Sequence, residues 1–375
     1  MMGKELYRIF SRKIALLALA VATAFLVYYG FFHIGEEAVM EDGNLFRYGE
    51  AVARDIEIAE EFAGPLTEET VRAIWEKYGA PVNYIDHVVK DEELRQRAEQ
   101  GGYDNYCNTL VARLFAGKVI QEDGTTALML PEEISDSRYL DGNYTFGYVG
   151  LGWSWYWDQF LMTFLLVSIV VIIALAPMFS EDYAFRTADI ILPTVKGHIR
   201  IWRTRVGTGF LFASAYYWLM GAFLFLLNTF FYGTDSLNVS CGFTHLQYDF
   251  MRDSDPLWKA VLILHLGGWF SMLALTLQIQ AVSSKNKSTF GSLLWSLAAY
   301  LGPIAVINLI LENLPFTGVN KWLQYFCYSM PLSFSGMYVQ APPSGKQILL
   351  TFALITAVLS CALGALCWCR HQVRN

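Results

Sequence analysis

The stretch that decides the fold is residues 155–179, which read WYWDQFLMTFLLVSIVVIIALAPMF. Asp158 is the one charged residue in this stretch, and it lies near the N-terminal end. An α-helix rises about 1.5 Å per residue, so an apolar run of this length can cross the roughly 30 Å hydrocarbon core of a bilayer. The stretch therefore predicts a transmembrane helix.

Five further runs share this composition, so the chain is predicted to cross the membrane six times. The six expected spans are residues 14–32, 155–179, 206–232, 257–282, 290–311 and 348–369. Only 16% of all residues are charged, whereas a soluble domain carries roughly a quarter. The first run could instead be a cleaved signal sequence. Residues 28–32, which read YYGFF, lack a small-x-small cleavage site, and this favours an uncleaved helix.

Basic residues near the span ends indicate the orientation. They gather in segments that share one side of the membrane if the chain crosses six times: residues 4–13, 186–205, 285–287 and 370–374. Cytoplasmic loops are enriched in Lys and Arg. We therefore expect both termini in the cytoplasm, an arrangement described as N-in/C-in.

The segment between the first two spans, residues 36–152, is called the acidic insertion below. It carries 24 acidic and 10 basic residues, although the whole chain has a net charge of only −7. A solvated acidic surface is the simpler interpretation, and attraction of basic partners is the alternative. Thr67 and Gly79 predict the ends of a helix over residues 68–78. Further helices are expected around 91–100 and 106–115, and a strand near 127–130.

The fold class that follows is an all-α polytopic membrane protein with a mostly helical extracellular domain. Residues 1–35 are expected to hold the cytoplasmic N-terminus and the first span. The acidic insertion forms the extracellular domain, and residues 153–375 hold the other five spans. Within this last part, residues 180–205 form a cytoplasmic loop and residues 313–346 an extracellular segment.

Several enzyme signatures are absent. The chain contains no G-x-x-x-x-G-K-[ST] phosphate-binding loop, no H-E-x-x-H and no G-x-S-x-G. The six cysteines have no C-x-x-C spacing, which makes a zinc or redox site an unfavoured interpretation. Cys107, Cys241 and Cys327, on the expected exterior, are either unpaired or include one disulfide. His265 falls within the fourth expected span, where it is either a functional residue or a hydrogen-bonded packing residue.

The loop of residues 180–205 is the most informative segment. Glu181 and Asp182 open it, an apolar set follows at helical spacing (residues 188, 191 and 192), and a basic run closes it. This pattern is typical of a short amphipathic helix at the membrane surface. Such a helix can dock on a cytoplasmic partner or merely anchor the loop in lipid, and its residues alone favour neither.

Short motifs give the chain a resemblance to a known family. They are FSED at 179–182, IILPT at 190–194, KGHIR at 196–200 and, in the acidic insertion, GPLTEE at 64–69. On these motifs the chain resembles the permease subunits of bacterial ABC-2 type transporters. Two positions depart from the family pattern: Arg186 stands where the family usually has Gly, and Arg205 stands where it usually has Lys.

The resemblance implies a transporter. Two permease chains would pair with two separate ATP-binding subunits, and the complex would export a hydrophobic or amphipathic substrate such as a peptide antibiotic, a lipid or a drug. The location would be the bacterial plasma membrane, in contact with membrane lipid. This chain would bind no cofactor or metal and would not be an enzyme itself, because ATP and Mg²⁺ would bind to the partner subunit. No nucleic acid is expected as a partner.

The resemblance also assigns roles to segments. The 180–205 loop would be a coupling helix seated in a groove of the ATPase. By position, the residues at that contact would be Glu181, Asp182, Thr187, Lys196, Gly197 and Arg200, with Glu181 and Arg200 as the main polar partners. Residues 313–346 would form a re-entrant segment dipping into the outer leaflet, or else an ordinary exterior loop packed on the acidic insertion.

Two other classes of protein stay open. A membrane sensor or immunity protein would bind a ligand through the acidic insertion and signal through the 180–205 loop. An intramembrane enzyme would need convergent His, Asp or Glu residues at membrane depth, and the sequence shows no such group. Dependence on ATP separates the transporter from the sensor.

Overall fold

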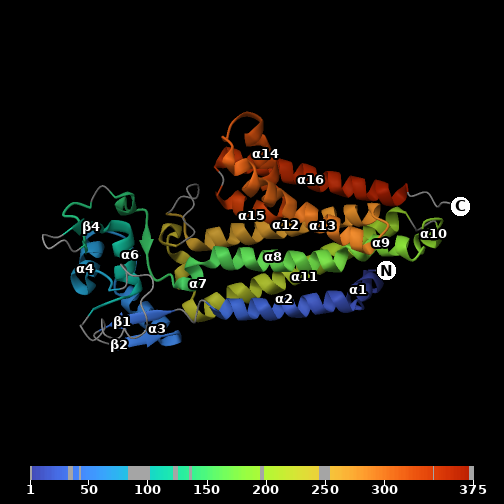
Figure 1. Ribbon diagram of the computed structural model, residues 1–375. Helices are drawn as coiled ribbons and strands as arrows, with labels where there is room; N and C mark the ends of the chain where they lie inside the picture. The colour runs from blue at the N-terminus through green and yellow to red at the C-terminus, as the bar shows by residue number, and fades with distance from the viewer. Residues whose placement is uncertain are drawn as a thin grey trace. The chain divides into compact units, whose positions relative to one another are not determined.

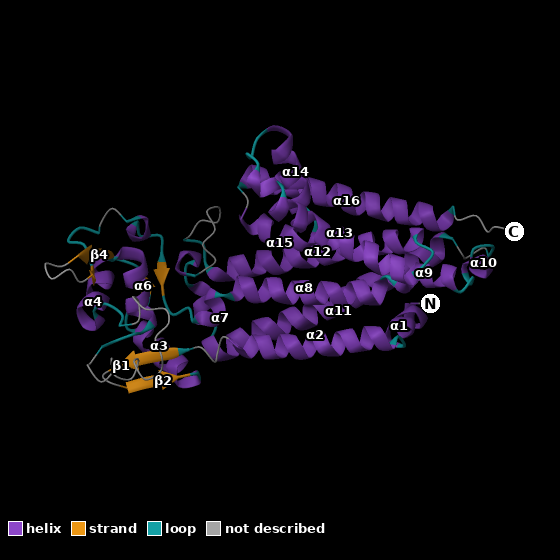
Figure 2. Cartoon of the chain, viewed as in Figure 1, coloured by secondary structure: helices purple, strands orange, loops and turns teal. Residues whose placement is uncertain are grey.

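The computed structural model describes residues 2–32, 37–41, 44–82, 102–120, 126–134, 137–194, 198–244, 254–340 and 342–370. Helices dominate these residues, as Figures 1 and 2 show. The chain divides into two compact units. Unit 1 comprises residues 1–27, 160–223 and 262–375, and unit 2 comprises residues 28–159 and 224–261.

Six long apolar helices account for the predicted spans. They are α2 (Lys13–Phe32), α8 (Tyr156–Leu175), α11 (Ile199–Tyr232), α12 (Leu257–Lys285), α13 (Thr289–Leu309) and α16 (Pro343–Cys369). Each contains a segment long enough to cross a bilayer, with a mean hydropathy between 1.7 and 2.7. The prediction of six apolar helices is confirmed, and the chain is a helical multi-pass membrane protein.

The largest difference in boundary concerns α11. We predicted a span from residue 206, but the helix begins at Ile199 and includes Arg200, Arg203 and Arg205. Hydropathy ends a predicted span at the first cluster of charges. A helix can continue through such a cluster where the charges reach solvent or find partners, and Arg205 finds partners.

Short helices complete unit 1. They are α1 (Met2–Phe10), α9 (Pro177–Ala184), α10 (Ala188–Ile191), η5 (Leu311–Asn313), α14 (Gly318–Tyr328) and α15 (Pro331–Gln340). Helices α14 and α15 lie between α13 and α16 in the chain and pack beside α16 (Figure 1). Phe334 of α15 contacts Leu349 and Ala353 of α16, and the ring of Phe352 meets the aromatic rings of α14 edge-on. Within the predicted segment 313–346, α14 and α15 therefore form a helical hairpin that packs on α16.

Unit 2 mixes short helices with short strands. Its helices are α3 (Gly49–Glu60), α4 (Glu68–Tyr78), α6 (Tyr106–Phe115), η2 (Arg138–Leu140), α7 (Leu151–Ser154), η3 (Asp235–Asn238) and η4 (Cys241–Phe243). Its strands are β1 (Ala38–Glu41), β2 (Asn44–Arg47), β3 (Gly64–Pro65), β4 (Gly117–Ile120), β5 (Thr126–Met129) and β6 (Thr145–Phe146). They form three antiparallel pairs, β1 with β2, β3 with β6, and β4 with β5.

Local signals predicted several elements of the acidic insertion correctly. Helix α4 begins after Thr67, whose hydroxyl accepts a hydrogen bond from the amide of Thr70 at 3.2 Å. It ends at Gly79, where φ is +64° and glycine avoids the steric cost of this conformation. Helix α6 and strand β5 also lie where we expected them. The helix predicted around 91–100 lies outside the described residues.

No disulfide joins the cysteines in the part of the chain that the structure describes. Cys107, Cys241 and Cys327 are each buried, so they pack as small apolar side chains. Of the two alternatives that the sequence left open, the structure therefore favours the one without a disulfide.

Candidate functional site

Six charged side chains meet where α1, α9 and α11 come together in unit 1. This ion-pair network consists of Glu5, Arg8, Arg12, Glu181, Asp182 and Arg205. Three carboxylates face three guanidinium groups, so the network as a whole is neutral. It joins segments that are far apart in the sequence, since Arg8 and Asp182 are separated by 174 positions.

Asp182 is the centre of the network. One carboxylate oxygen accepts a hydrogen bond from the Arg8 guanidinium at 2.7 Å, and the other pairs with the Arg205 guanidinium at 2.5 Å. The Thr187 hydroxyl also donates to Asp182, at 3.1 Å. The side chains of Asp182 and Arg205 are only 5% and 2% exposed. Such a buried pair is costly to break, because removing one partner leaves the other charge buried without compensation.

Arg205 is held by aromatic rings as well as by carboxylates. Its guanidinium lies 5.0 Å from the ring centre of Phe179 and 5.3 Å from that of Trp368. Both distances are within the range of a cation–π interaction. Glu5 of α1 contacts Arg205 at 3.4 Å. Arg205 therefore connects α11 with α1, α9 and α16.

Glu181 extends the network towards the start of α2. Its carboxylate pairs with Arg12 and lies 3.0 Å from the Arg8 guanidinium. Arg12 also donates to the backbone carbonyl of Ala174, at 2.9 Å. Burial lowers the pKa of Arg8, but the Asp182 and Glu181 carboxylates outweigh that effect and leave this pKa above its ordinary value. The carboxylates thus compensate the buried charge of Arg8, whereas burial outweighs the pairing with Glu181 at Arg12 and leaves the pKa of Arg12 below its ordinary value.

The bend after α9 is made by an unusual residue. Arg186 has a φ of +57°, the left-handed conformation that favours glycine. This is the position at which the family named above usually has Gly. An L-residue pays about 1–2 kcal/mol for this conformation. The bend is therefore present in this chain although the expected glycine is not.

The amphipathic helix predicted in the 180–205 loop is shorter than we expected, because α10 contains only four residues. Ala188 and Leu192 are buried, as the apolar pattern predicted. Phe185 and Ile190, in contrast, place large apolar side chains on the surface, and Ile190 is 75% exposed. The loop thus presents an apolar surface of its own.

The predicted contact residues are divided between the interior and the surface. Asp182 is buried in the network, and Glu181 pairs there with Arg8 and Arg12. Thr187 is exposed, although its hydroxyl donates to Asp182. Arg200 is exposed in the first turn of α11. Lys196 and Gly197 lie outside the described residues.

The sequence did not show that Arg8, Arg12 and Arg205 are partners of the loop. We interpreted the first two only as signs of orientation. Helical spacing gave no signal for this pair, because Arg8 lies in α1 and Arg12 lies between α1 and α2.

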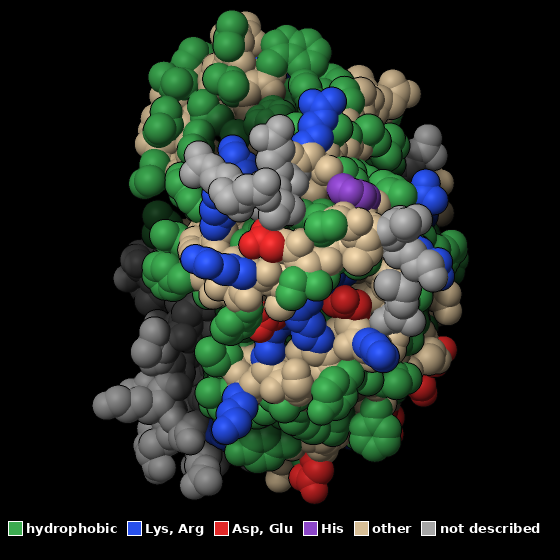
Figure 3. Space-filling model, turned by 90° about the vertical axis from the view of Figure 1, so that its right-hand side faces the viewer, with side chains coloured by type: hydrophobic (Ala, Val, Ile, Leu, Met, Phe, Trp, Pro, Cys, Tyr) green, Lys and Arg blue, Asp and Glu red, His purple; other side chains and the backbone are tan. Residues whose placement is uncertain are grey.

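Positive charge is spread over this end of unit 1. Figure 3 views the molecule from the side on which α9, α10 and both termini lie, and Lys and Arg side chains are distributed across that face among hydrophobic ones. This agrees with the basic segments found in the sequence. Phe185 and Ile190 add exposed apolar side chains in the neighbouring loop.

His265 has the features of a packing residue. It is buried in α12, stacks on the indole of Trp218 with ring centres 6.1 Å apart, and meets the ring of Phe160 edge-on at 5.2 Å. Within the described residues, no group of three His, Cys, Asp or Glu side chains could hold a metal ion. The part of the chain that the structure describes therefore offers no metal centre around His265.

The arrangement can act mechanically, because a displaced loop would move the helices to which its base is fixed.

No family model, no curated protein and no solved structure matches this chain.

Proposed function

We propose that this chain is the membrane-spanning subunit of an ATP-driven ABC-2 type exporter. In this proposal the 180–205 loop receives movement from a separate cytoplasmic ATPase subunit. The observation that carries the proposal is the buried ion-pair network at the base of that loop. The resemblance in the loop motifs and the absence of a phosphate-binding loop in this chain also support it.

The network supplies the rigid attachment that coupling requires. A force on an exposed loop moves membrane helices only if the base of the loop cannot yield. Asp182 joins the loop to α1 and α11 through Arg8 and Arg205, and Glu181 joins it to Arg12 at the start of α2. Movement of the loop would then shift these helices together between two arrangements.

The proposal assigns two roles within the loop. Phe185, Ile190 and Arg200 are exposed and would contact the ATPase subunit. Glu181, Asp182 and Thr187 would hold the base of the loop, because their side chains are engaged inside this chain. This differs from our expectation that Glu181 itself is a main partner of the ATPase.

The proposal also implies on which side of the membrane the other segments lie. Both termini and the 180–205 loop would be cytoplasmic, and the acidic insertion would lie outside a bacterial plasma membrane. The α14–α15 hairpin would be the re-entrant segment of the outer leaflet. A second permease chain would complete the pathway for a hydrophobic or amphipathic substrate.

Purification of the full-length chain in a mild detergent, followed by mass spectrometry of co-purifying proteins, tests the proposal. We expect a stoichiometric subunit that carries a phosphate-binding loop. The variant Ile190→Ser should reduce its recovery. The matched control is Ile120→Ser, since Ile120 is similarly exposed, at 77%, but lies in the acidic insertion.

A folded chain that co-purifies with no ATPase would contradict the proposal and would favour the membrane sensor. Equal recovery of the ATPase with both variants would contradict the contact assigned to Ile190. The two results are distinguishable, because the second leaves the ATPase present.

A further inference from the structure

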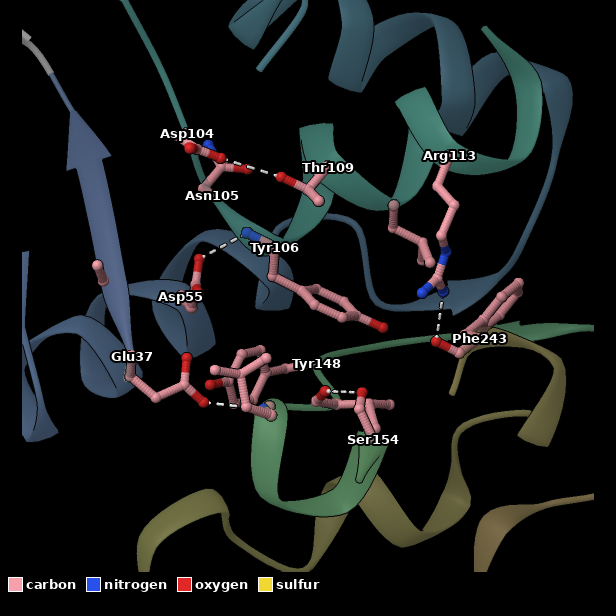
Figure 4. A pocket seen from close by; sticks show the side chains of 15 residues that line it. Glu37, Asp55, Asp104, Asn105, Tyr106, Thr109, Arg113, Tyr148, Ser154 and Phe243 are labelled. Carbon is pink, nitrogen blue, oxygen red and sulfur yellow. Dashed lines mark hydrogen bonds between the residues drawn. The ribbon is translucent and has the colours of Figure 1, made fainter. Parts of the chain in front are cut away.

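A cavity of about 250 Å³ lies within unit 2, among β1, α3, α6 and α7. Figure 4 shows the side chains that line it. The lining includes Glu37, Asp55, Asn105, Tyr106, Arg113 and Tyr148. Pockets for drug-sized ligands usually measure roughly 300–1,000 Å³, so this cavity suits a smaller molecule. The inference does not rest on the proposed function.

Two buried carboxyl groups form one wall of the cavity. Glu37 and Asp55 are only 6% and 5% exposed. Each has one oxygen held by a backbone amide, Glu37 by Leu151 at 2.8 Å and Asp55 by Tyr106 at 2.9 Å. Among the described residues, neither carboxyl forms an ion pair with Lys, Arg or His. Burial of an acidic side chain without a counter-charge costs free energy. A bound cation at this wall would offset that cost.

Neutral polar groups in the same cavity also lack partners. Tyr148 and Asn105 are 7% and 3% exposed. The Tyr148 hydroxyl and the Asn105 side-chain nitrogen have no hydrogen-bond partner among the described residues. The same holds for the Tyr106 hydroxyl, which Figure 4 shows directed across the cavity. Buried polar groups are normally satisfied, so these atoms indicate a site for a polar ligand.

The opposite end of the cavity carries a positive charge. Arg113 donates one hydrogen bond to the carbonyl of Phe243 at 2.8 Å, and its Nε has no partner among the described residues. Figure 4 places Glu37 and Asp55 on one side, Arg113 on the other, and the Tyr106 ring between them. The cavity therefore has an end lined by two carboxyl groups, an aromatic middle and a cationic end.

This polarity distinguishes between ligands. A metal ion needs several close carboxylates, and no group of three His, Cys, Asp or Glu among the described residues is arranged to hold one. An ammonium group, in contrast, can bind two carboxylates by charge-assisted hydrogen bonds and lie against aromatic faces. The rings of Tyr106 and Tyr148, with centres 5.3 Å apart, offer such faces. Arg113 suits a carboxylate.

We propose that this cavity binds a free α-amino acid, with its ammonium group between Glu37 and Asp55 and its carboxylate directed towards Arg113. The ligand supplies the cation that the acidic wall lacks. It also supplies partners for the polar atoms of the tyrosine and asparagine side chains.

The acid–base properties of the wall agree with this assignment. Burial raises the pKa of Glu37 to about 7 and raises the pKa of Asp55 well above its ordinary range. The other titratable groups that face this pair are Glu41, Asp104, Tyr106, Cys107, Tyr148 and Tyr232. An ammonium group favours the charged form of both carboxyls. Binding should therefore release protons near pH 7 and weaken as the pH falls below 7.

Thermal unfolding of the purified full-length chain in detergent provides the test. The unfolding midpoint is followed with each of the common L-amino acids in turn, in large excess over the protein. We expect at least one amino acid to raise the midpoint. Its N-acetyl derivative, which has no ammonium group, should leave the midpoint unchanged.

Variants locate the binding in the cavity. Glu37→Gln and Asp55→Asn should each weaken binding by roughly ten-fold or more, because each loses a charge-assisted hydrogen bond. Glu50→Gln is the matched control, since Glu50 is an exposed acid in the first turn of α3. Arg113→Gln should weaken binding of the amino acid more than binding of its amide.

Several results would overturn the assignment. They are no shift with any amino acid, an equal shift with the N-acetyl derivative, unchanged binding by Glu37→Gln, or a shift produced by Ca²⁺ alone. Equal losses for the amino acid and its amide in Arg113→Gln would overturn the position of the carboxylate. All these measurements are independent of any ATPase subunit.

Discussion

Asp182 in the ion-pair network and Glu37 in the cavity are both almost excluded from solvent, yet their surroundings differ. Asp182 faces two guanidinium groups, those of Arg8 and Arg205. Glu37 accepts a hydrogen bond from the backbone amide of Leu151 and has no ion-pair partner among the described residues. Positive charges therefore compensate the burial of Asp182, whereas no side-chain charge among the described residues compensates the burial of Glu37.

The difference in surroundings indicates a different role for each region. A buried carboxylate with charged partners costs little as it stands and much when a partner is removed. Such a group fixes the relative positions of the elements it joins. A buried carboxyl without a counter-charge lowers stability at neutral pH, so its presence points to a binding role. We therefore infer that the ion-pair network holds helices in position and that the cavity binds a ligand.

The variant Asp182→Ala removes the central carboxylate of the ion-pair network and should lower the free energy of unfolding more than any other change proposed here. It leaves Arg205, which is almost fully buried, and Arg8 without their main carboxylate. We expect a loss of about 3–5 kcal/mol in the free energy of unfolding. Chemical unfolding in detergent, followed by tryptophan fluorescence, measures it. Asp189→Ala is the control, because Asp189 is a partly exposed acid in the neighbouring helix α10.

A double variant separates loss of charge balance from loss of packing. Asp182→Leu combined with Arg205→Met replaces the pair by apolar side chains, and such replacements of buried pairs are often neutral. We expect the double variant to recover most of the stability that Asp182→Ala loses. A double variant as unstable as Asp182→Ala would contradict the assignment of the stability to the balance of charges.

On the side of the cavity, Glu37→Gln should change how stability depends on pH. The pKa of Glu37 is about 7 in the folded chain and 4.5 at its ordinary value. Between these values the folded state binds a proton that the unfolded state does not. The contribution of Glu37 to the free energy of unfolding is therefore largest below pH 4.5. It falls by about 3 kcal/mol in total as the pH rises towards 7.

Unfolding of the two proteins at a series of pH values checks this. The variant should match the natural chain near pH 4 and exceed it above pH 7, with the gap opening between these values. Parallel curves for the two proteins over the whole range would show that Glu37 is not an uncompensated acid. Glu50→Gln again serves as the exposed control.

What the sequence predicted well was decided by nearby residues. The six long helices follow from runs of apolar side chains, and the ends of α4 follow from Thr67 and Gly79. These signals act within a few positions of the chain, so they can be read without knowing the fold.

Neither site could be predicted, because each depends on distant residues. Arg8 and Asp182 are 174 positions apart, and Arg113 and Phe243 are 130 apart. In the sequence, Arg8 and Arg12 had an adequate explanation as signs of orientation, and Glu37 was one acid among many in the acidic insertion. Only the folded chain shows which charges have partners.

A smaller effect is expected at Arg186, next to the network. Its φ of +57° is costly for an L-residue and free for glycine. Because glycine also makes the unfolded chain more flexible, we expect Arg186→Gly to raise the free energy of unfolding by about 0.5–1 kcal/mol. Arg186→Val should lower it, since a β-branched residue tolerates this conformation poorly. Chemical unfolding of both variants measures the difference. The opposite order would mean that the bend is held by contacts of the arginine side chain.

The smallest effect tests whether burial, rather than distance, gives the network its strength. Lys77 and Glu61 lie 2.5 Å apart, the same distance as Asp182 and Arg205, but their side chains are 48% and 51% exposed. Water screens both charges whether or not they are paired, so the pair should contribute no more than about 1 kcal/mol. A double-mutant cycle with Lys77→Met and Glu61→Gln isolates this energy from the packing of each side chain. If the cycle instead gave a coupling as large as that of Asp182 with Arg205, short ion pairs would stabilise this chain wherever they occur. The contrast between the network and the rest of the charged surface would then have to be explained by something other than exclusion of solvent.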